Sequence, residues 1–402
     1  MMQTSLLLRA TLVLSCFFTT STQLQLQAQE TEAKPKVAKP KAAKAEKKAE
    51  TQKSPSLKMP EAPFDLEEPD PQPHDYNGQD LREFPAAQLR QVAQESAMNR
   101  SSKQALQLQY WAVQNDPTRG SDALATYYAH AKDIDAAIYY LQEAASEQGL
   151  DVRWAKEYPD LANLRADDRW EKLLPYLEAC SKAWAEGDHR REVLTLPAGY
   201  TAGEPIPILI GLHGYGSKPE DFAGGKEDQE LADKLGMALL GVSASKPRGR
   251  NSFVWSEDLK TDYDHIKEAL ERVKDKVTPK KGSVILAGFS QGAQLSTELA
   301  AKYPNEFDGV IALSPGMGRE SNLAACIRKD SKAYEGMNVI IIIGSEESFG
   351  NIIMAQENAA TLREAGVKVI EHTFEGMGHS FPPGFYDQIH IWLQFMLPAE
   401  AP

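Results

Sequence analysis

Cysteine is scarce in this sequence, and its scarcity argues against two kinds of site. The 402 residues include only Cys16, Cys180 and Cys326. Cysteines so few and so far apart provide neither the paired spacing of a zinc site nor a disulfide framework. We therefore interpret Cys180 and Cys326 as packing residues. The sequence as a whole implies neither a metal nor an organic cofactor.

Long apolar runs and an excess of positive charge on the folded part are also lacking. The apolar run at residues 10–18 is too short to cross a bilayer, so no transmembrane span is expected. The chain carries a formal net charge of −13, and residues 31–59 alone carry +6, which leaves −19 on residues 60–402. This balance argues against a nucleic-acid surface.

The first residues have the layout of a secretory signal peptide. Arg9 precedes the apolar run, and small and polar residues follow up to Ala28. We therefore predict a signal peptide over residues 1–28 and an exported protein, which is periplasmic, envelope-associated or secreted. Cys16 follows Val-Leu-Ser and loosely resembles a lipoprotein processing site, so lipidation at Cys16 stays open beside cleavage near Ala28.

Residues 29–83 are predicted to be a disordered tether. They are rich in Lys, Ala and Pro at first, and then acidic and Pro-rich over residues 60–73. Such a composition buries too little apolar surface to offset the entropy of ordering the chain. The positive charge could hold an exported protein near an anionic envelope or polysaccharide, and a solvated spacer is the alternative.

Residues 84–188 have the composition of helices, with little Gly and much Ala, Leu, Gln and Glu. Small residues recur at spacings that resemble about two degenerate tetratricopeptide units. An all-α region of this kind could bind a protein partner, or it could pack on the domain that follows. Both interpretations stay open, because about three repeats are usually needed for independent stability. The small positions are Ala93, Ala105, Ala112, Ala125, Ala137 and Ala144.

Residues 189–402 alternate short apolar runs with helical segments. This order predicts an α/β domain with a doubly wound, mostly parallel sheet. The runs are apolar almost throughout, as strands covered on both faces require. Strands are expected at residues 206–212, 237–243, 283–289, 309–313, 338–343 and 367–374, and helices at 262–276, 291–302, 351–365 and 385–395.

One strand runs directly into the string GFSQG at residues 288–292, and a helix is expected immediately after it. A sharp strand-to-helix turn needs glycines two residues to either side of the central serine, because side chains there would collide with the turn. This context predicts Ser290 as an exposed nucleophile.

Three strings together resemble the phospholipase/carboxylesterase branch of the α/β-hydrolases. They are LHGYG at residues 212–216, YPNEFDG at 303–309, after the serine turn, and GMGH at 376–379. The resemblance covers about residues 192–397. It implies acyl transfer to water, with a small-molecule or polymeric ester as substrate.

The same resemblance implies the partners of Ser290. His379, in a Gly-rich loop near the end of the chain, is expected to be the base. The acid is expected after the strand 338–343, where the family pattern selects Glu347. Since this position normally holds aspartate, Glu346 stays open as the alternative.

The oxyanion formed during acyl transfer needs backbone N–H donors. Gln291 follows the nucleophile and supplies one, and the resemblance places the second at Tyr215. His213 and Trp255 are assigned to the wall of the substrate pocket, although His213 could instead shape its loop and Trp255 could pack in the core. Residues 246–250, KPRGR, could contact an acidic substrate, and a solvated loop is the default expectation.

These features predict a serine esterase. A thioesterase or peptidase of the same fold is the alternative within enzymes, because the three catalytic residues do not choose among esters, thioesters and amides. An interaction protein that uses its helical repeats and carries an inactive hydrolase domain is the alternative outside them.

Overall fold

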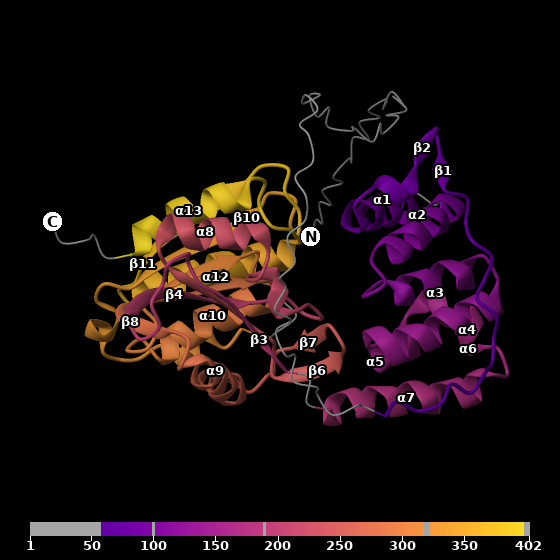
Figure 1. Cartoon of the computed structure of the whole chain (residues 1–402), viewed down its shortest axis with the longest axis horizontal. Helices are drawn as coiled ribbons and strands as arrows, with labels where there is room; N and C mark the ends of the chain where they lie inside the picture. Colours follow the sequence, from indigo (N-terminus) through magenta and orange to yellow (C-terminus); the bar gives the residue numbers. More distant parts are fainter. Residues whose placement is uncertain (1–57, 99–100, 188–189, 317–320, 398–402) are drawn as a thin grey trace, which may run out of the picture. The chain divides into compact units, whose positions relative to one another are not determined.

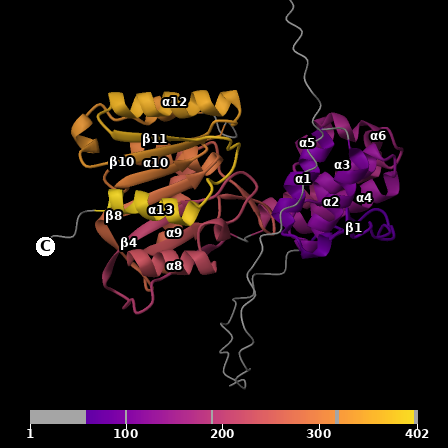
Figure 2. The same ribbon diagram turned by 90° about the horizontal axis from the view of Figure 1, so that it is seen from above.

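A seven-stranded sheet forms the centre of the C-terminal domain. The computed structural model describes residues 58–98, 101–187, 190–316 and 321–397, so the predicted signal peptide lies outside the described residues. The strand order across the sheet is β11-β10-β9-β8-β4-β5-β3, and Figure 2 shows β11, β10, β8 and β4 in this spatial order. All neighbours are parallel except β3 and β5. The strands are β3 (Glu192–Thr195), β4 (Pro205–Leu212), β5 (Ala238–Val242), β8 (Thr278–Phe289), β9 (Gly309–Leu313), β10 (Asn338–Gly344) and β11 (Lys368–Phe374).

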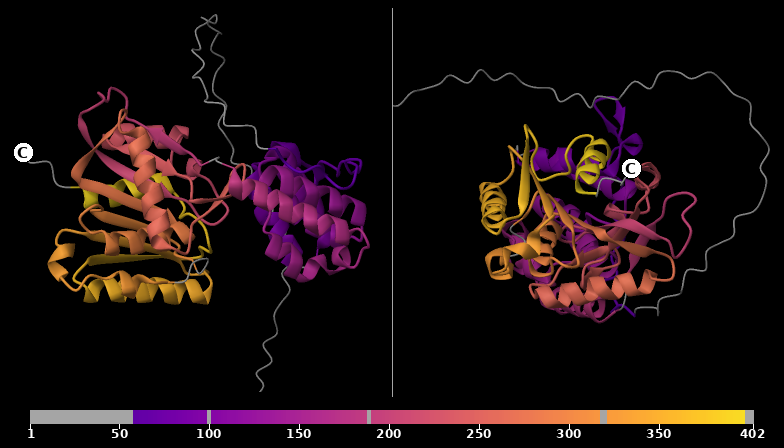
Figure 3. Two further views of the ribbon diagram at one scale, coloured as in Figure 1. Left: turned by 90° about the horizontal axis from the view of Figure 1, so that it is seen from below. Right: turned by 90° about the vertical axis from the view of Figure 1, so that its left-hand side faces the viewer.

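Helices cover both faces of this sheet, as the right-hand view of Figure 3 shows. One face carries α9 (Leu259–Val273), α10 (Gln291–Lys302), α11 (Leu323–Cys326) and α12 (Phe349–Glu364), and the other carries α8 (Lys226–Leu235) and α13 (Phe385–Met396). Two short 3-10 helices, η4 (Pro219–Asp221) and η5 (Ser331–Tyr334), lie in the connections. The predicted α/β-hydrolase architecture is confirmed.

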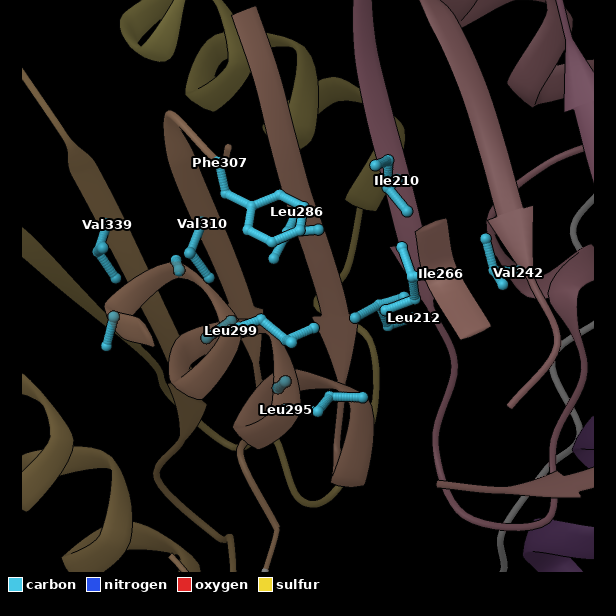
Figure 4. Packing of buried hydrophobic residues seen from close by; sticks show 14 of the residues in the cluster. Ile210, Leu212, Val242, Ile266, Leu286, Leu295, Leu299, Phe307, Val310 and Val339 are labelled. Atoms are coloured by element: carbon cyan, nitrogen blue, oxygen red, sulfur yellow. The ribbon is translucent and has the colours of Figure 1, made fainter. Parts of the chain in front are cut away.

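Adjacent residues of a central strand enter different cores. Ile285 belongs to the cluster under α8 and α13, whereas Leu286 belongs to the cluster under α9 and α10. Side chains alternate along a strand, so a sheet covered on both faces needs apolar residues at every position. Figure 4 shows the second cluster, where Leu299 of α10 extends toward the strand of Leu286 and Leu212 lies beside Ile266.

The first four residues of the KPRGR segment form one strand of a hairpin, so the loop prediction for them is wrong. Strand β6 (Lys246–Gly249) pairs with β7 (Ser252–Val254) in antiparallel register. Gly249 and the charged residues around it suggested a loop. The paired strands are only a few residues long, so they leave little apolar pattern from which a hairpin could be predicted. The hairpin leads directly to Trp255 and carries Arg248.

The N-terminal region consists of helices that pack in pairs, α1 with α2 and α3 with α4 (Figure 1). The small residues that indicated close helix packing are all buried. The tetratricopeptide resemblance itself stays a prediction. The helices are α1 (Ala86–Met98), α2 (Ser102–Asn115), α3 (Ser121–His130), α4 (Ile134–Glu143), α5 (Val152–Glu157), α6 (Ala162–Arg165) and α7 (Trp170–Glu186), with the π-helical turn η2 (Ala144–Gln148) and the 3-10 turns η1 (Leu81–Glu83) and η3 (Pro159–Leu161).

Residues 58–83 pack against these helices, so the predicted tether is wrong over this range. The backbone of Phe64 exchanges two hydrogen bonds with the side-chain amide of Gln142, at 3.2 and 3.1 Å. Leu81 is fully buried, and the short strands β1 (Asp75–Tyr76) and β2 (Gln79–Asp80) pair nearby. A few well-placed apolar side chains in an acidic, Pro-rich segment are enough to dock it on the helices.

Candidate active site

Ser290 occupies the turn between β8 and α10 in a conformation that few non-glycine residues adopt. Its φ is 54° and its ψ is −117°. A Cβ on Gly288 would lie 2.2 Å from the carbonyl oxygen of Gly292, and one on Gly292 would lie 2.0 Å from that of Leu212. Only glycine fits at both positions, which is the physical reason for the GFSQG spacing.

The structure brings Ser290, His379 and Glu347 into one hydrogen-bonded chain. His379 Nε2 lies 2.9 Å from Ser290 Oγ, and His379 Nδ1 lies 2.6 Å from Glu347 Oε2. The three residues follow β8, β11 and β10, whose carboxyl ends meet at one edge of the parallel sheet. Side chains far apart in sequence converge there, as is general for open α/β sheets.

Of the two candidate acids, Glu347 and not Glu346 contacts the imidazole. The second oxygen of Glu347 accepts hydrogen bonds from the backbone N–H of Ser348 at 2.8 Å and from Asn351 Nδ2 at 3.0 Å. These donors hold the buried carboxylate with its other oxygen toward His379. The side chain of Glu346 is exposed. Asn351 was not singled out in the sequence, and only its place four residues after Glu347 could have indicated it.

Gly316 lies against Ser290 and His379 and was also missed in the sequence. A Cβ at this position would lie 2.8 Å from Ser290 Oγ and 3.4 Å from His379 Cε1. The residue follows β9, the neighbour of β8 in the sheet. Its position after a strand end was a usable signal, but nothing in the local sequence distinguished it from other loop glycines.

His213 orients the loop that passes beside Ser290. Its Nδ1 lies 2.7 Å from the carbonyl oxygen of Gly214, and its Nε2 accepts the backbone N–H of Ala244 at 3.0 Å. Burial lowers the pKa of His213 to about 4, so the ring is neutral and Nδ1 is the donor. In a trans peptide the N–H points opposite to the C=O, so the N–H of Tyr215 points away from His213. A Cβ on Gly214 would lie 3.3 Å from Ser290 Cβ, so this peptide borders Ser290.

Trp255 and His213 are buried beneath the loops of the site, and their assignment to a pocket wall is wrong. Trp255 is 1% exposed and His213 is 0% exposed, so neither presents surface to a ligand. The indole N–H of Trp255 donates to the His213 carbonyl at 2.8 Å, and its backbone N–H donates to Gln291 Oε1 at 3.1 Å. The hairpin folds Trp255 inward, which the sequence could not show.

Aromatic side chains line the other side of the imidazole. The ring of Phe289 lies 5.0 Å from that of His379 and stacks on Phe381 at 4.6 Å between centroids. Phe381 packs edge-on against Phe385. Both Phe289 and Phe381 are partly exposed, so the site has an apolar face.

The arrangement contains the parts needed for nucleophilic acyl transfer. It has a strained serine, a histidine within hydrogen-bonding distance and a buried carboxylate that orients the ring. Among the described residues, no group of three or more His, Cys, Asp or Glu side chains is placed to hold a metal ion. The predicted donors Gln291 and Tyr215 flank the serine, one in the next position of the chain and one in the adjoining loop.

Residues 252–397 match the model of the Phospholipase/Carboxylesterase family. Ser290, Glu347 and His379 all lie inside this range. The chain therefore carries a phospholipase/carboxylesterase domain. The chemistry of this domain is that of a carboxylic ester hydrolase.

The chain is also similar in sequence to two curated proteins. Acyl-protein thioesterase 1 of Gibberella zeae is 24% identical over 232 residues, which cover 52% of this chain and 96% of the relative. Feruloyl esterase C of Emericella nidulans is 29% identical over 128 residues, which cover 32% of this chain and 47% of the relative. Among solved structures, the carboxylesterase of Bacillus cereus is 20% identical with a TM-score of 0.39, covering 54% of this chain and 99% of that one.

Proposed function

We propose that the protein is an exported serine esterase that hydrolyses carboxylic esters through an acyl-enzyme on Ser290. The observation that carries this proposal is the continuous hydrogen-bonded chain from Ser290 Oγ through His379 to Glu347. A serine hydroxyl is a weak nucleophile by itself, and a histidine held in the correct tautomer by a carboxylate removes its proton as it attacks.

In the first half of the reaction, Ser290 Oγ attacks the ester carbonyl carbon and His379 Nε2 takes the hydroxyl proton. Glu347 accepts the Nδ1–H and stabilises the imidazolium that forms. The carbonyl oxygen becomes negative, and the N–H groups of Gln291 and Tyr215 stabilise it. When the intermediate collapses, His379 gives its proton to the departing alcohol.

The second half hydrolyses the acyl-enzyme. His379 takes a proton from a water molecule, which attacks the acyl carbon on Ser290. The same N–H groups stabilise the second oxyanion. The proton then returns to Ser290 as the carboxylic acid leaves, and the site is ready for another ester.

Labelling with a fluorophosphonate probe tests this mechanism. The wild-type protein is expected to bind the probe covalently at Ser290 and to cleave p-nitrophenyl butyrate, whereas Ser290→Ala should do neither. Ser331→Ala, at an exposed serine in η5, is the matched control and should behave as wild type. An unlabelled wild-type protein without turnover would refute the esterase and favour an interaction protein with an inactive hydrolase domain.

Thioester hydrolysis is the second candidate, because the chain is similar to Acyl-protein thioesterase 1 over most of that protein's length. The apolar face formed by Phe289 and Phe381 suits an acyl chain whether the leaving atom is oxygen or sulfur. Comparing kcat/KM for the ethyl ester and the ethyl thioester of butyrate separates the two, since only the leaving atom differs. A preference for the thioester beyond its intrinsic reactivity toward hydroxide would favour the second candidate.

Export rests on the layout of residues 1–28 alone. Expression of the full chain in a bacterial host, followed by mass spectrometry of the mature N-terminus, checks it. Cleavage near Ala28 would support secretion, a diacylated Cys16 would indicate a lipoprotein, and an intact N-terminus would contradict both. In the described part of the chain, no helix is both long enough and apolar enough to cross a membrane.

A further inference from the structure

A carboxylate of the helical region contacts the side chain of Tyr215. Asp151 Oδ2 accepts a hydrogen bond from the Tyr215 hydroxyl at 2.9 Å. The other oxygen, Oδ1, accepts the backbone N–H groups of Arg153 and Trp154 at 3.0 and 3.2 Å, so Asp151 is the N-cap of α5. The capping bonds fix the carboxylate, which therefore offers Tyr215 an acceptor in one position.

Arg248 of the β6–β7 hairpin completes this contact. Its guanidinium lies 4.8 Å from the centre of the Tyr215 ring and 3.7 Å from Asp151 Oδ2. Burial raises the pKa of the Asp151 carboxyl, but hydrogen bonds from Tyr215 and Trp154 and the charge of Arg248 outweigh burial and leave this pKa below its ordinary value. Asp151 is therefore a charged acceptor at neutral pH.

Near this contact, the backbone at residues 148–149 and the backbone at residues 248–249 approach each other too closely for a side chain to fit between them. A Cβ on Gly149 would lie 2.2 Å from the carbonyl oxygen of Arg248, and a Cβ on Gly249 would lie 1.8 Å from that of Gln148. Gly149 also has a φ of 90°. Both segments belong to one compact unit, Lys53–Pro402. This close backbone contact requires glycine on both sides.

Packing alone does not hold the ring of Tyr215. The residue is 48% exposed and borders a cavity of about 310 Å³, whose other lining residues include Arg119, Trp154 and Ser252. The bond to Asp151 and the contact with Arg248 are therefore the interactions that restrict the ring. The fixed ring restrains the backbone of the same residue through its two side-chain torsions, and it adds to the hydrogen bond from the Gly216 N–H to the Phe253 carbonyl at 2.9 Å.

We propose that Asp151 is a positioning residue for catalysis, because it holds Tyr215 so that its backbone N–H points at the developing oxyanion. The proposal rests on the proposed serine esterase function and extends it to the helical region. That region then supplies a part of the catalytic unit, whereas a repeat module that only binds partners would leave turnover unaffected. His213 holds the same peptide from the Gly214 side.

Kinetics of full-length variants test this role. Tyr215→Phe removes the hydroxyl and leaves the α5 cap intact, so kcat for p-nitrophenyl butyrate should fall about tenfold, while KM changes less than about twofold. A lost oxyanion donor costs about 10²- to 10³-fold, and a displaced donor should cost less. In Asp151→Ala, kcat should fall at least as far. Asp151→Asn keeps an acceptor oxygen and the cap, so it should retain most of kcat.

Glu147→Gln is the matched control. It breaks the Glu147–Arg250 ion pair, 3.0 Å long, which joins the same two segments without touching Tyr215. We expect wild-type kcat from it. Equal losses in Glu147→Gln and Tyr215→Phe, or an unchanged kcat in Tyr215→Phe, would overturn the positioning role while fluorophosphonate labelling of Ser290 left the esterase mechanism standing. A wild-type protein that is not labelled would overturn both.

Discussion

Glu347 Oε2 lies 2.6 Å from His379 Nδ1, while the adjacent Glu346 turns its side chain to solvent. Aspartate is the usual residue at this point of the family pattern, and here the longer glutamate reaches the imidazole. Two donors on its other oxygen, from Ser348 and Asn351, restrict the longer chain. Because only Glu347 of these two glutamates contacts His379, substitutions at Glu347 and Glu346 should have different effects on turnover.

Glu347→Gln is expected to lower kcat about 10³-fold or more. An amide N–H facing Nδ1 favours the wrong tautomer of His379, and the imidazolium loses its counter-charge. Ester turnover by Glu347→Gln and Glu346→Gln, measured side by side, checks this. Glu346→Gln should behave as wild type, and a larger loss in it than in Glu347→Gln would contradict the assignment.

Gly316→Ala should lower kcat about tenfold without much change in Tm. The new methyl group would lie 2.8 Å from Ser290 Oγ, so the hydroxyl or the loop must move, and small displacements of reacting groups are costly. Steady-state kinetics and a thermal melt measure the two quantities. An unchanged kcat in Gly316→Ala would contradict this prediction, because it would mean that the loop shifts to accept the methyl group without displacing Ser290.

Stability should fall on acidification below about pH 6.5, partly because of His213. Its folded-state pKa is about 4, whereas an unfolded histidine titrates near 6.5. Between these values the unfolded chain binds the extra proton, so the free energy of unfolding decreases by up to about 1.4 kcal/mol per pH unit as pH falls. Urea unfolding at pH 7 and pH 5 should show a smaller decrease for His213→Gln than for wild type.

His265 adds to the same effect, because burial lowers its pKa as well. The double variant with His265→Gln should therefore lose more of the pH dependence than either single variant. If all three variants show the wild-type decrease between pH 7 and pH 5, the stability change originates in other groups.

Leu286→Ala should cost about 2 to 5 kcal/mol of unfolding free energy, because it empties space between the sheet and α10. Ile391→Ala is the comparison at a similar side chain, which is 57% exposed on α13, and it should change stability by about 0.5 kcal/mol or less. Denaturant melts of both variants measure the difference. Similar values for both would contradict the placement of Leu286 in the core.

The sheet and the serine turn could be predicted because their signals are local. Two-sided burial imposes a continuous apolar run, and the close backbone contacts at the Ser290 turn impose glycines two residues to either side, so a few neighbouring residues carry the information. The helices at 291–302 and 385–395 also stand within one residue of the observed ends. The docked segment 58–83 was missed, because composition says little about where single apolar side chains find partners.

The sequence by itself determined the fold class and the family resemblance of the domain, and it predicted Ser290 as the nucleophile, since each depends on spacing along one stretch of chain. Only the tertiary structure decided that Glu347 meets His379, that Gly316 borders Ser290, that Trp255 turns inward and that Asp151 reaches Tyr215. These relationships join residues from different strands, loops and helices. Their geometry depends on strand register, loop paths and the close approach of two backbones, which the pattern of one segment does not contain.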